Sequence, residues 1–136
     1  MHMTTPSPSP SKPWHIALWV VQGLLAATLI WAAAIKLFQS PEALAAMWPW
    51  TADNPALVKR TGVVDLLGGL GLVLPGLLRI APKLTVWAAL GTVTLMVAAS
   101  AFHIGRSEAD SIGFNVLVAL LAAGIAWGRS VKAPLR

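Results

Sequence analysis

The sequence contains no cysteine among its 136 residues. This absence excludes a disulfide framework, a thiol relay and a thiolate metal site within the chain. Any redox chemistry would therefore need a bound cofactor or a partner protein. Metal-ligand spacing is also missing, because no Glu-x-x-His or His-x-x-x-His pattern brings two ligands to one helical face, and we predict no metal site.

Charge is the second scarce feature. Charged residues make up only 11% of the chain, whereas about a quarter of an ordinary soluble domain is charged. Hydrophobic residues reach 57%, and the mean hydropathy is +0.72. The net charge of +5 does not indicate nucleic-acid binding, because the basic residues are spread singly rather than gathered in a run. We predict an integral membrane protein whose partner is the lipid bilayer and whose basic residues flank its spans.

Four apolar runs are long enough to cross a hydrocarbon core of about 30 Å as helices. They cover about residues 14–38, 57–78, 84–103 and 111–128. The predicted fold class is all-α, an integral membrane four-helix bundle. Residues 1–13, rich in Pro and Ser, are expected to form a disordered tail, and residues 129–136 a basic cytoplasmic tail. A cleaved signal peptide is the competing interpretation of the first run, but that run is long and the charge before it is sparse.

The segment 39–60, between the first two runs, is expected to lie at the membrane interface. A Ser-Pro pair at 40–41 predicts the cap and first turn of a short helix, and an Asn-Pro pair at 54–55 predicts the start of the second membrane helix. Trp48 and Trp50 fit the headgroup region, where amphipathic aromatic rings collect.

Basic residues are distributed unevenly between the two sides that four spans create. One side would carry both tails and the turn at 79–83, with six basic residues and no acid: Lys12, Arg79, Lys83, Arg129, Lys132 and Arg136. The other side would carry four basic residues together with four acids. The positive-inside rule therefore predicts that the N-terminus and the C-terminus are both cytoplasmic.

Asp65 is set into the first turns of the second run, about 7 to 8 Å along a helix from Arg60. Because lipid offers no hydrogen bonds, this carboxylate is expected to face the bundle interior or a wet cavity and to find a partner there. Gly62 and Gly69 share its helical face, and small residues let a neighbouring helix approach closely.

The polar residues of the four runs converge in the half of the membrane opposite the termini. The candidates for a ligand pocket there are Lys36, Asp65, His103, Asn115 and, in the last connector, Glu108. An acid, a base, an imidazole and an amide at similar depth are enough to build a buried polar network. By contrast, the cytoplasmic half of the bundle is expected to contain almost nothing ionisable.

Each candidate also has a purely structural interpretation. Lys36 and Asp65 would form a salt bridge that fixes the helix register, or Lys36 would extend to the outer surface. His103 would cap its helix at the interface, and Asn115 would hydrogen-bond to a neighbouring helix. The sequence identifies no catalytic residue and leaves these alternatives open.

The order and spacing of these features resemble the DoxX-like family of small bacterial membrane proteins. The resemblance covers nearly all of residues 14–127 and is carried by a lysine ending the first run, by Gly62-Val-Val-Asp65-Leu-Leu-Gly-Gly-Leu-Gly-Leu-Val-Leu-Pro75, by Ala98-Ala-Ser-Ala-Phe-His103-Ile-Gly-Arg-Ser-Glu108, and by Asn115. Family members often carry glutamate at the position of Asp65. The resemblance implies a bacterial inner membrane and an association with quinone-dependent redox systems, with a quinone as the candidate cofactor.

Three functions follow as hypotheses. In the first, the polar pocket opens to the outer side and either serves a membrane redox complex or binds a lipophilic molecule such as a quinone. In the second, the chain is a structural or assembly subunit without chemistry of its own. The third, a small transporter, is less favoured because the cytoplasmic half lacks ionisable groups. Small-residue faces, Gly62 with Gly69 and Ala119 with Ala123, would permit a homo-oligomer.

Overall fold

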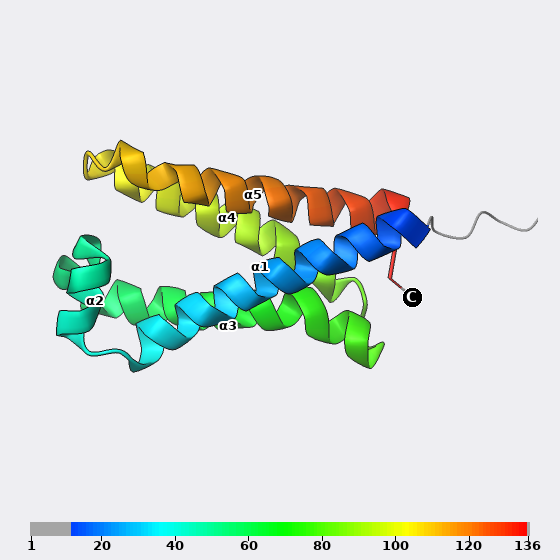
Figure 1. Ribbon diagram of the computed structural model, residues 1–136, viewed down its shortest axis with the longest axis horizontal. Helices are drawn as coiled ribbons and strands as arrows, with labels where there is room; N and C mark the ends of the chain where they lie inside the picture. Colours follow the sequence, from blue (N-terminus) through cyan, green and yellow to red (C-terminus); the bar gives the residue numbers. More distant parts are fainter. Residues whose placement is uncertain (1–11, 136) are drawn as a thin grey trace, which may run out of the picture.

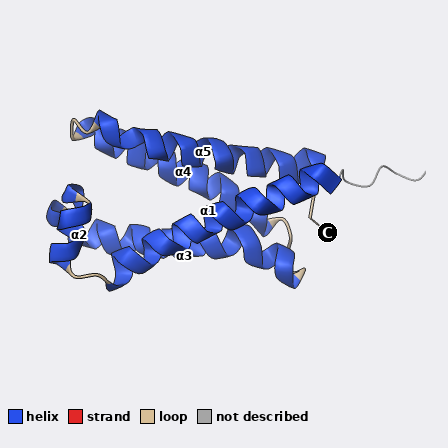
Figure 2. Cartoon of the chain, viewed as in Figure 1, coloured by secondary structure: helices blue, strands red, loops and turns tan. Residues whose placement is uncertain are grey.

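The computed structural model describes residues 12–135, so most of the predicted Pro/Ser tail, residues 1–11, and Arg136 lie outside the described residues. Four long helices correspond to the predicted spans: α1 (Lys12–Phe38), α3 (Pro55–Leu78), α4 (Leu84–Gly105) and α5 (Ile112–Trp127). The other elements are α2 (Pro41–Met47), the 3-10 turns η1 (Pro49–Asp53) and η2 (Ala109–Ser111), and the π-helical turn η3 (Gly128–Lys132). Figure 2 shows helix over most of the described chain, with loops at the connections and at its C-terminal end.

The predicted fold class is confirmed. Within residues 12–135, four helical segments are long and apolar enough to cross a membrane, the last of them formed by η2, α5 and η3 together. The Ser-Pro pair predicts the start of α2 correctly, because Ser40 Oγ accepts a hydrogen bond from the backbone N–H of Ala43. Asn54 occupies the predicted cap position of α3, but its side chain instead donates to the carbonyl of Trp50.

The long helices alternate in direction, so both ends of the described chain lie at one end of the bundle (Figure 1). We call this the terminal end; it also holds the α3–α4 turn. The opposite end, which holds α2, η1 and the α4–α5 connection, is called the capped end. α1 packs mainly on α3 and α4 mainly on α5, and α3 and α4 join the two pairs. Toward the capped end, the two pairs separate (Figure 1).

Glycines on α3 let α1 pack closely against it. A Cβ atom on Gly69 would lie 2.7 Å from Cγ1 of Ile30 and 3.1 Å from the carbonyl oxygen of Ala26, and one on Gly62 would lie 3.0 Å from Cβ of Lys36. The predicted role of these glycines in helix approach is therefore confirmed. Because α1 covers both, they do not form an exposed face for self-association, and this part of the sequence interpretation is wrong.

Pro75 leaves a carbonyl in α3 without its helical donor, because proline has no backbone N–H. That carbonyl belongs to Gly71, and the hydroxyl of Thr85 on α4 donates to it over 3.3 Å. One residue further on, the carbonyl of Leu72 accepts a hydrogen bond of 2.6 Å from the side chain of Gln22 on α1. Side chains of α1 and α4 thus hold α3 near its proline, and α3 continues to Leu78.

Candidate functional site

A salt bridge joins Lys36, in the last turn of α1, to Asp65 of α3. Lys36 Nζ lies 2.7 Å from Asp65 Oδ2, and the two side chains are only 14% and 3% exposed. The absence of a side chain at Gly62 brings the α1 end close enough for this contact. Lys36 therefore turns into the bundle and does not extend away to the outer surface, and Asp65 has the buried partner that its position in an apolar helix requires.

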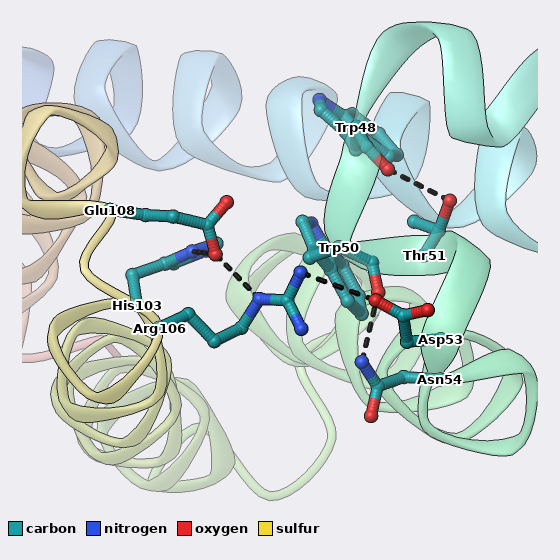
Figure 3. Close-up of polar contacts among 8 residues, drawn as sticks. All are labelled: Trp48, Trp50, Thr51, Asp53, Asn54, His103, Arg106 and Glu108. Atoms are coloured by element: carbon teal, nitrogen blue, oxygen red, sulfur yellow. Dashed lines mark hydrogen bonds and ion pairs between the residues drawn. The ribbon is translucent and has the colours of Figure 1, made fainter.

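Two tryptophans lie beside this ion pair. Lys36 Nζ is 6.0 Å from the ring centroid of Trp48 and 5.9 Å from that of Trp50, which are cation–π distances. The hydroxyl of Thr51 donates to the Trp48 carbonyl, and these contacts hold η1 across the capped end (Figure 3). The sequence placed both rings in the headgroup region and did not reveal this role. The prolines around these tryptophans were the available signal in the sequence, because they predict that the segment between α1 and α3 forms short turns.

A second group of polar contacts lies at the end of α4, in and around the α4–α5 connection. Glu108 turns back on its helix, since its N–H donates to the His103 carbonyl over 2.8 Å, and Glu108 Oε1 lies 3.6 Å from His103 Nδ1. Arg106 Nε donates to Glu108 Oε1 over 2.6 Å, and Arg106 Nη2 lies 3.5 Å from Asp53 Oδ2 in η1 (Figure 3). The hydrogen bond from Arg106 lowers the pKa of Glu108. Arg106 thus bridges the α4–α5 connector and the cap.

His103 Nδ1 is buried without a hydrogen-bond partner among the described residues. The His103 ring instead packs edge-on against Trp50, with 6.3 Å between centroids, and against Phe102. A buried polar atom left in this state calls for an explanation, and one explanation is a ligand group not present in the structure.

All five candidate residues line one cavity of about 710 Å³. The cavity lies between the two helix pairs at the capped end, and Asn115 contributes to it from the buried face of α5. Apolar side chains make up most of the remaining wall, among them Leu29, Ala32, Leu95, Met96, Phe102, Phe114 and Val118. The structure therefore brings Lys36, Asp65, His103, Glu108 and Asn115 together. Among residues 12–135, no group of three His, Asp or Glu side chains has the arrangement of a metal site.

A second polar cluster, which the sequence did not predict, lies at the terminal end. Arg129 is only 3% exposed, and Nε donates to the side-chain oxygen of Gln22 over 2.5 Å. Arg129 Nη1 lies 3.0 Å from His15 Nδ1 and donates to the Ala133 carbonyl over 2.9 Å, and the guanidinium lies 5.4 Å from the Trp19 ring. The expectation that this half contains almost nothing ionisable is wrong, because α5 continues into η3 and turns Arg129 inward instead of ending in a free tail.

Comparison with protein families gave a match over most of the chain. Neither the curated proteins nor the solved structures include a significant match to this chain. The model of one membrane-protein family matches residues 20–125, a stretch that contains the salt bridge, the capped-end cavity and all four long helices in large part. The chain belongs to the DoxX-like family.

Proposed function

We propose that this protein binds a membrane-dissolved molecule with a polar head, such as a quinone, in the capped-end cavity, as an accessory subunit of a membrane redox system. The observation that carries the proposal is the position of the Lys36–Asp65 pair in the wall of a mainly apolar cavity of about 710 Å³. Small-molecule sites typically measure about 300–1,000 Å³ and combine apolar walls with a few polar groups.

The lining groups suit a flat ring with carbonyl oxygens. The ammonium of Lys36 and the amide of Asn115 line the cavity, and each can donate a hydrogen bond to a carbonyl oxygen of the ligand. Trp48 and Trp50 offer aromatic faces beside them. His103 Nδ1, which makes no hydrogen bond among the described residues and lies 3.6 Å from Glu108 Oε1, can donate or accept according to its tautomer. A bound quinone would supply electron transfer, and the protein groups would bind and orient its head.

We also propose that the cavity faces the outer side of a bacterial inner membrane. The terminal end carries Lys12, Arg79, Lys83, Arg129 and Lys132, whereas every acidic residue of the chain belongs to the capped half. The positive-inside rule then assigns the terminal end to the cytoplasm.

Mass spectrometry of the lipophilic molecules that copurify in mild detergent tests the binding proposal. The native chain should retain a quinone, and Asp65→Asn should lose it, because the substitution removes the partner that positions Lys36. Glu42→Gln is the matched control, since Glu42 is an exposed acid of α2 outside the cavity lining, and it should retain the molecule. Ordinary phospholipid alone, in equal amounts in all three proteins, would overturn the proposal.

A structural or assembly subunit is the second candidate, and the short Lys36–Asp65 contact favours it, because a buried ion pair can serve only to fix helix register. In that case the double variant Lys36→Met/Asp65→Leu should keep its association with partner membrane proteins, whereas a ligand-binding function should be lost. Copurification of both partner proteins and lipophilic molecules with the native and double-variant chains distinguishes the two, because only the ligand-binding function predicts loss of the lipophilic molecule.

A small transporter has less support. Arg129 and His15 do provide ionisable groups in the terminal half, contrary to the sequence expectation. However, Leu25, Leu29 and Leu72 are buried in the apolar core that lies between the two polar clusters. Proton or solute flux above that of empty liposomes would reverse this judgement.

A further inference from the structure

A groove on the outside of the α3–α4 contact begins at the same carboxylate as the capped-end cavity. Its volume is about 220 Å³, and its walls are apolar apart from Asp65 and Thr92. Leu29, Asp65 and Leu95 line both the groove and the cavity. The two spaces therefore adjoin, with these three shared residues at their junction.

The groove follows α3 and α4 toward the terminal end until the helices close. It passes Gly68 and Gly91, and a Cβ atom on Gly91 would meet no other atom within 4 Å. The closure lies near Gly71, where a Cβ atom would come within 2.8 Å of Cβ of Ala88. Along α4 the groove lining runs from Ala88 to Leu95, about 10 Å of helix.

The groove faces the region that lipid hydrocarbon occupies. Val64 and Leu67, which line it, are large apolar side chains on the outer face of a membrane-spanning helix, and Leu67 is 64% exposed. A polar or charged occupant is unfavourable at this depth, whereas an apolar chain packs there through dispersion contacts. An apolar chain bound at this place would begin beside the Lys36–Asp65 pair.

We propose that the groove binds the first part of the tail of the molecule whose head occupies the cavity. The ligand class is then a tailed amphiphile, with a compact hydrogen-bonding head between the helix pairs and a hydrocarbon tail that leaves between α3 and α4. This inference rests on the proposed function, because it needs the head to bind in the cavity. A compact or water-soluble ligand would have no use for the groove.

Leucine at Gly91 adds an apolar side chain to the groove lining, and its Cβ atom would meet no other atom within 4 Å. Gly124→Leu is the matched control: Gly124 is an exposed glycine of α5, equally open and outside both linings. The probes are a decyl-substituted benzoquinone and the same ring without the decyl chain, titrated into the protein in nanodiscs. The readout is the ratio of the two dissociation constants, with unfolding temperatures as a check on the fold.

We expect Gly91→Leu to weaken binding of the decyl probe about tenfold, because the leucine side chain takes the space of the first part of the tail. The tailless ring should bind as before. Gly124→Leu should change neither constant. An unchanged ratio in Gly91→Leu would overturn the groove assignment, although binding of both probes would still support the proposed function. If neither probe binds the native chain and Asp65→Asn makes no difference, the proposed function itself fails.

Discussion

Arg129 and Gln22 are 107 residues apart in the sequence, and the guanidinium of the first donates a hydrogen bond of 2.5 Å to the side-chain oxygen of the second. The side-chain nitrogen of Gln22 donates in turn to the carbonyl of Leu72. One buried side chain thus connects η3, α1 and α3 at the terminal end. At the capped end the Lys36–Asp65 pair joins α1 to α3 again, so polar contacts hold α1 on α3 at two places along its length.

Gln22→Leu should destabilise the protein by about 1–3 kcal/mol, because it leaves the buried donor of Arg129 and the Leu72 carbonyl without their side-chain partner. Gln39→Leu removes the same kind of side chain just beyond α1, where it is exposed, and should stay within about 0.5 kcal/mol of the native chain. Unfolding in a denaturing detergent titration measures both. Equal effects would show that the terminal-end cluster is not a stabilising element.

Asp65→Leu alone should cost about 3–5 kcal/mol, because it leaves the ammonium of Lys36 buried without its carboxylate. The double variant Lys36→Met/Asp65→Leu should recover most of that loss, since apolar groups of similar volume replace a buried ion pair with little penalty. A double-mutant cycle on the free energy of unfolding gives the coupling. Additive single effects would contradict the 2.7 Å pairing.

Gly69→Ala should destabilise the α1–α3 contact by about 1–3 kcal/mol, because the new Cβ atom would lie 2.7 Å from Cγ1 of Ile30 and force it to move. Gly124→Ala is the control on an open helix face, and the better helix propensity of alanine should leave that variant unchanged or stabilised by up to about 1 kcal/mol. Thermal unfolding of the two variants in the same detergent separates close packing from helix propensity.

The contact between Arg106 and Glu108 should depend on pH. Its hydrogen bond lowers the folded-state pKa of Glu108 below the ordinary value of 4.5. A lowered pKa means that the contribution to stability is complete above about pH 4.5 and is lost as the pH falls through the lower, folded-state value. Hydrogen exchange of η1, measured from pH 6 down to pH 3, should therefore slow less at the acid end than the intrinsic exchange rate does, because protection is lost there. Glu108→Gln should remove this step, and Glu42→Gln should keep it.

The absence of native cysteine makes the orientation directly testable. Ala52→Cys places an exposed thiol in η1, and Ile80→Cys places one in the α3–α4 turn at the terminal end. In intact spheroplasts, an impermeant maleimide should label the first and reach the second only after lysis. The opposite pattern would reverse the proposed orientation of the termini.

The sequence by itself determined the number and approximate limits of the membrane helices, because run length, hydropathy and the prolines and caps around them are local properties. It also placed Lys36, Asp65, His103, Glu108 and Asn115 at one end of the bundle, since alternating helix directions assign depth to each residue. The salt bridge between Asp65 and Lys36 was one of the predicted alternatives, because a carboxylate within a membrane span needs a partner and few side chains there can provide one.

Only the tertiary structure decided how the pairs of helices meet and what lies between them. The separation of α1 and α3 from α4 and α5 toward the capped end opens the cavity (Figure 1), and the turn from α2 into η1 brings Trp48 and Trp50 to Lys36. From the sequence, Arg129 was predicted to be a charge of the C-terminal tail. Hydropathy describes composition along the chain and does not show the direction in which a side chain points. The burial of Arg129 depends on acceptors from Gln22 and Ala133, which come together only when the C-terminal turn packs on α1.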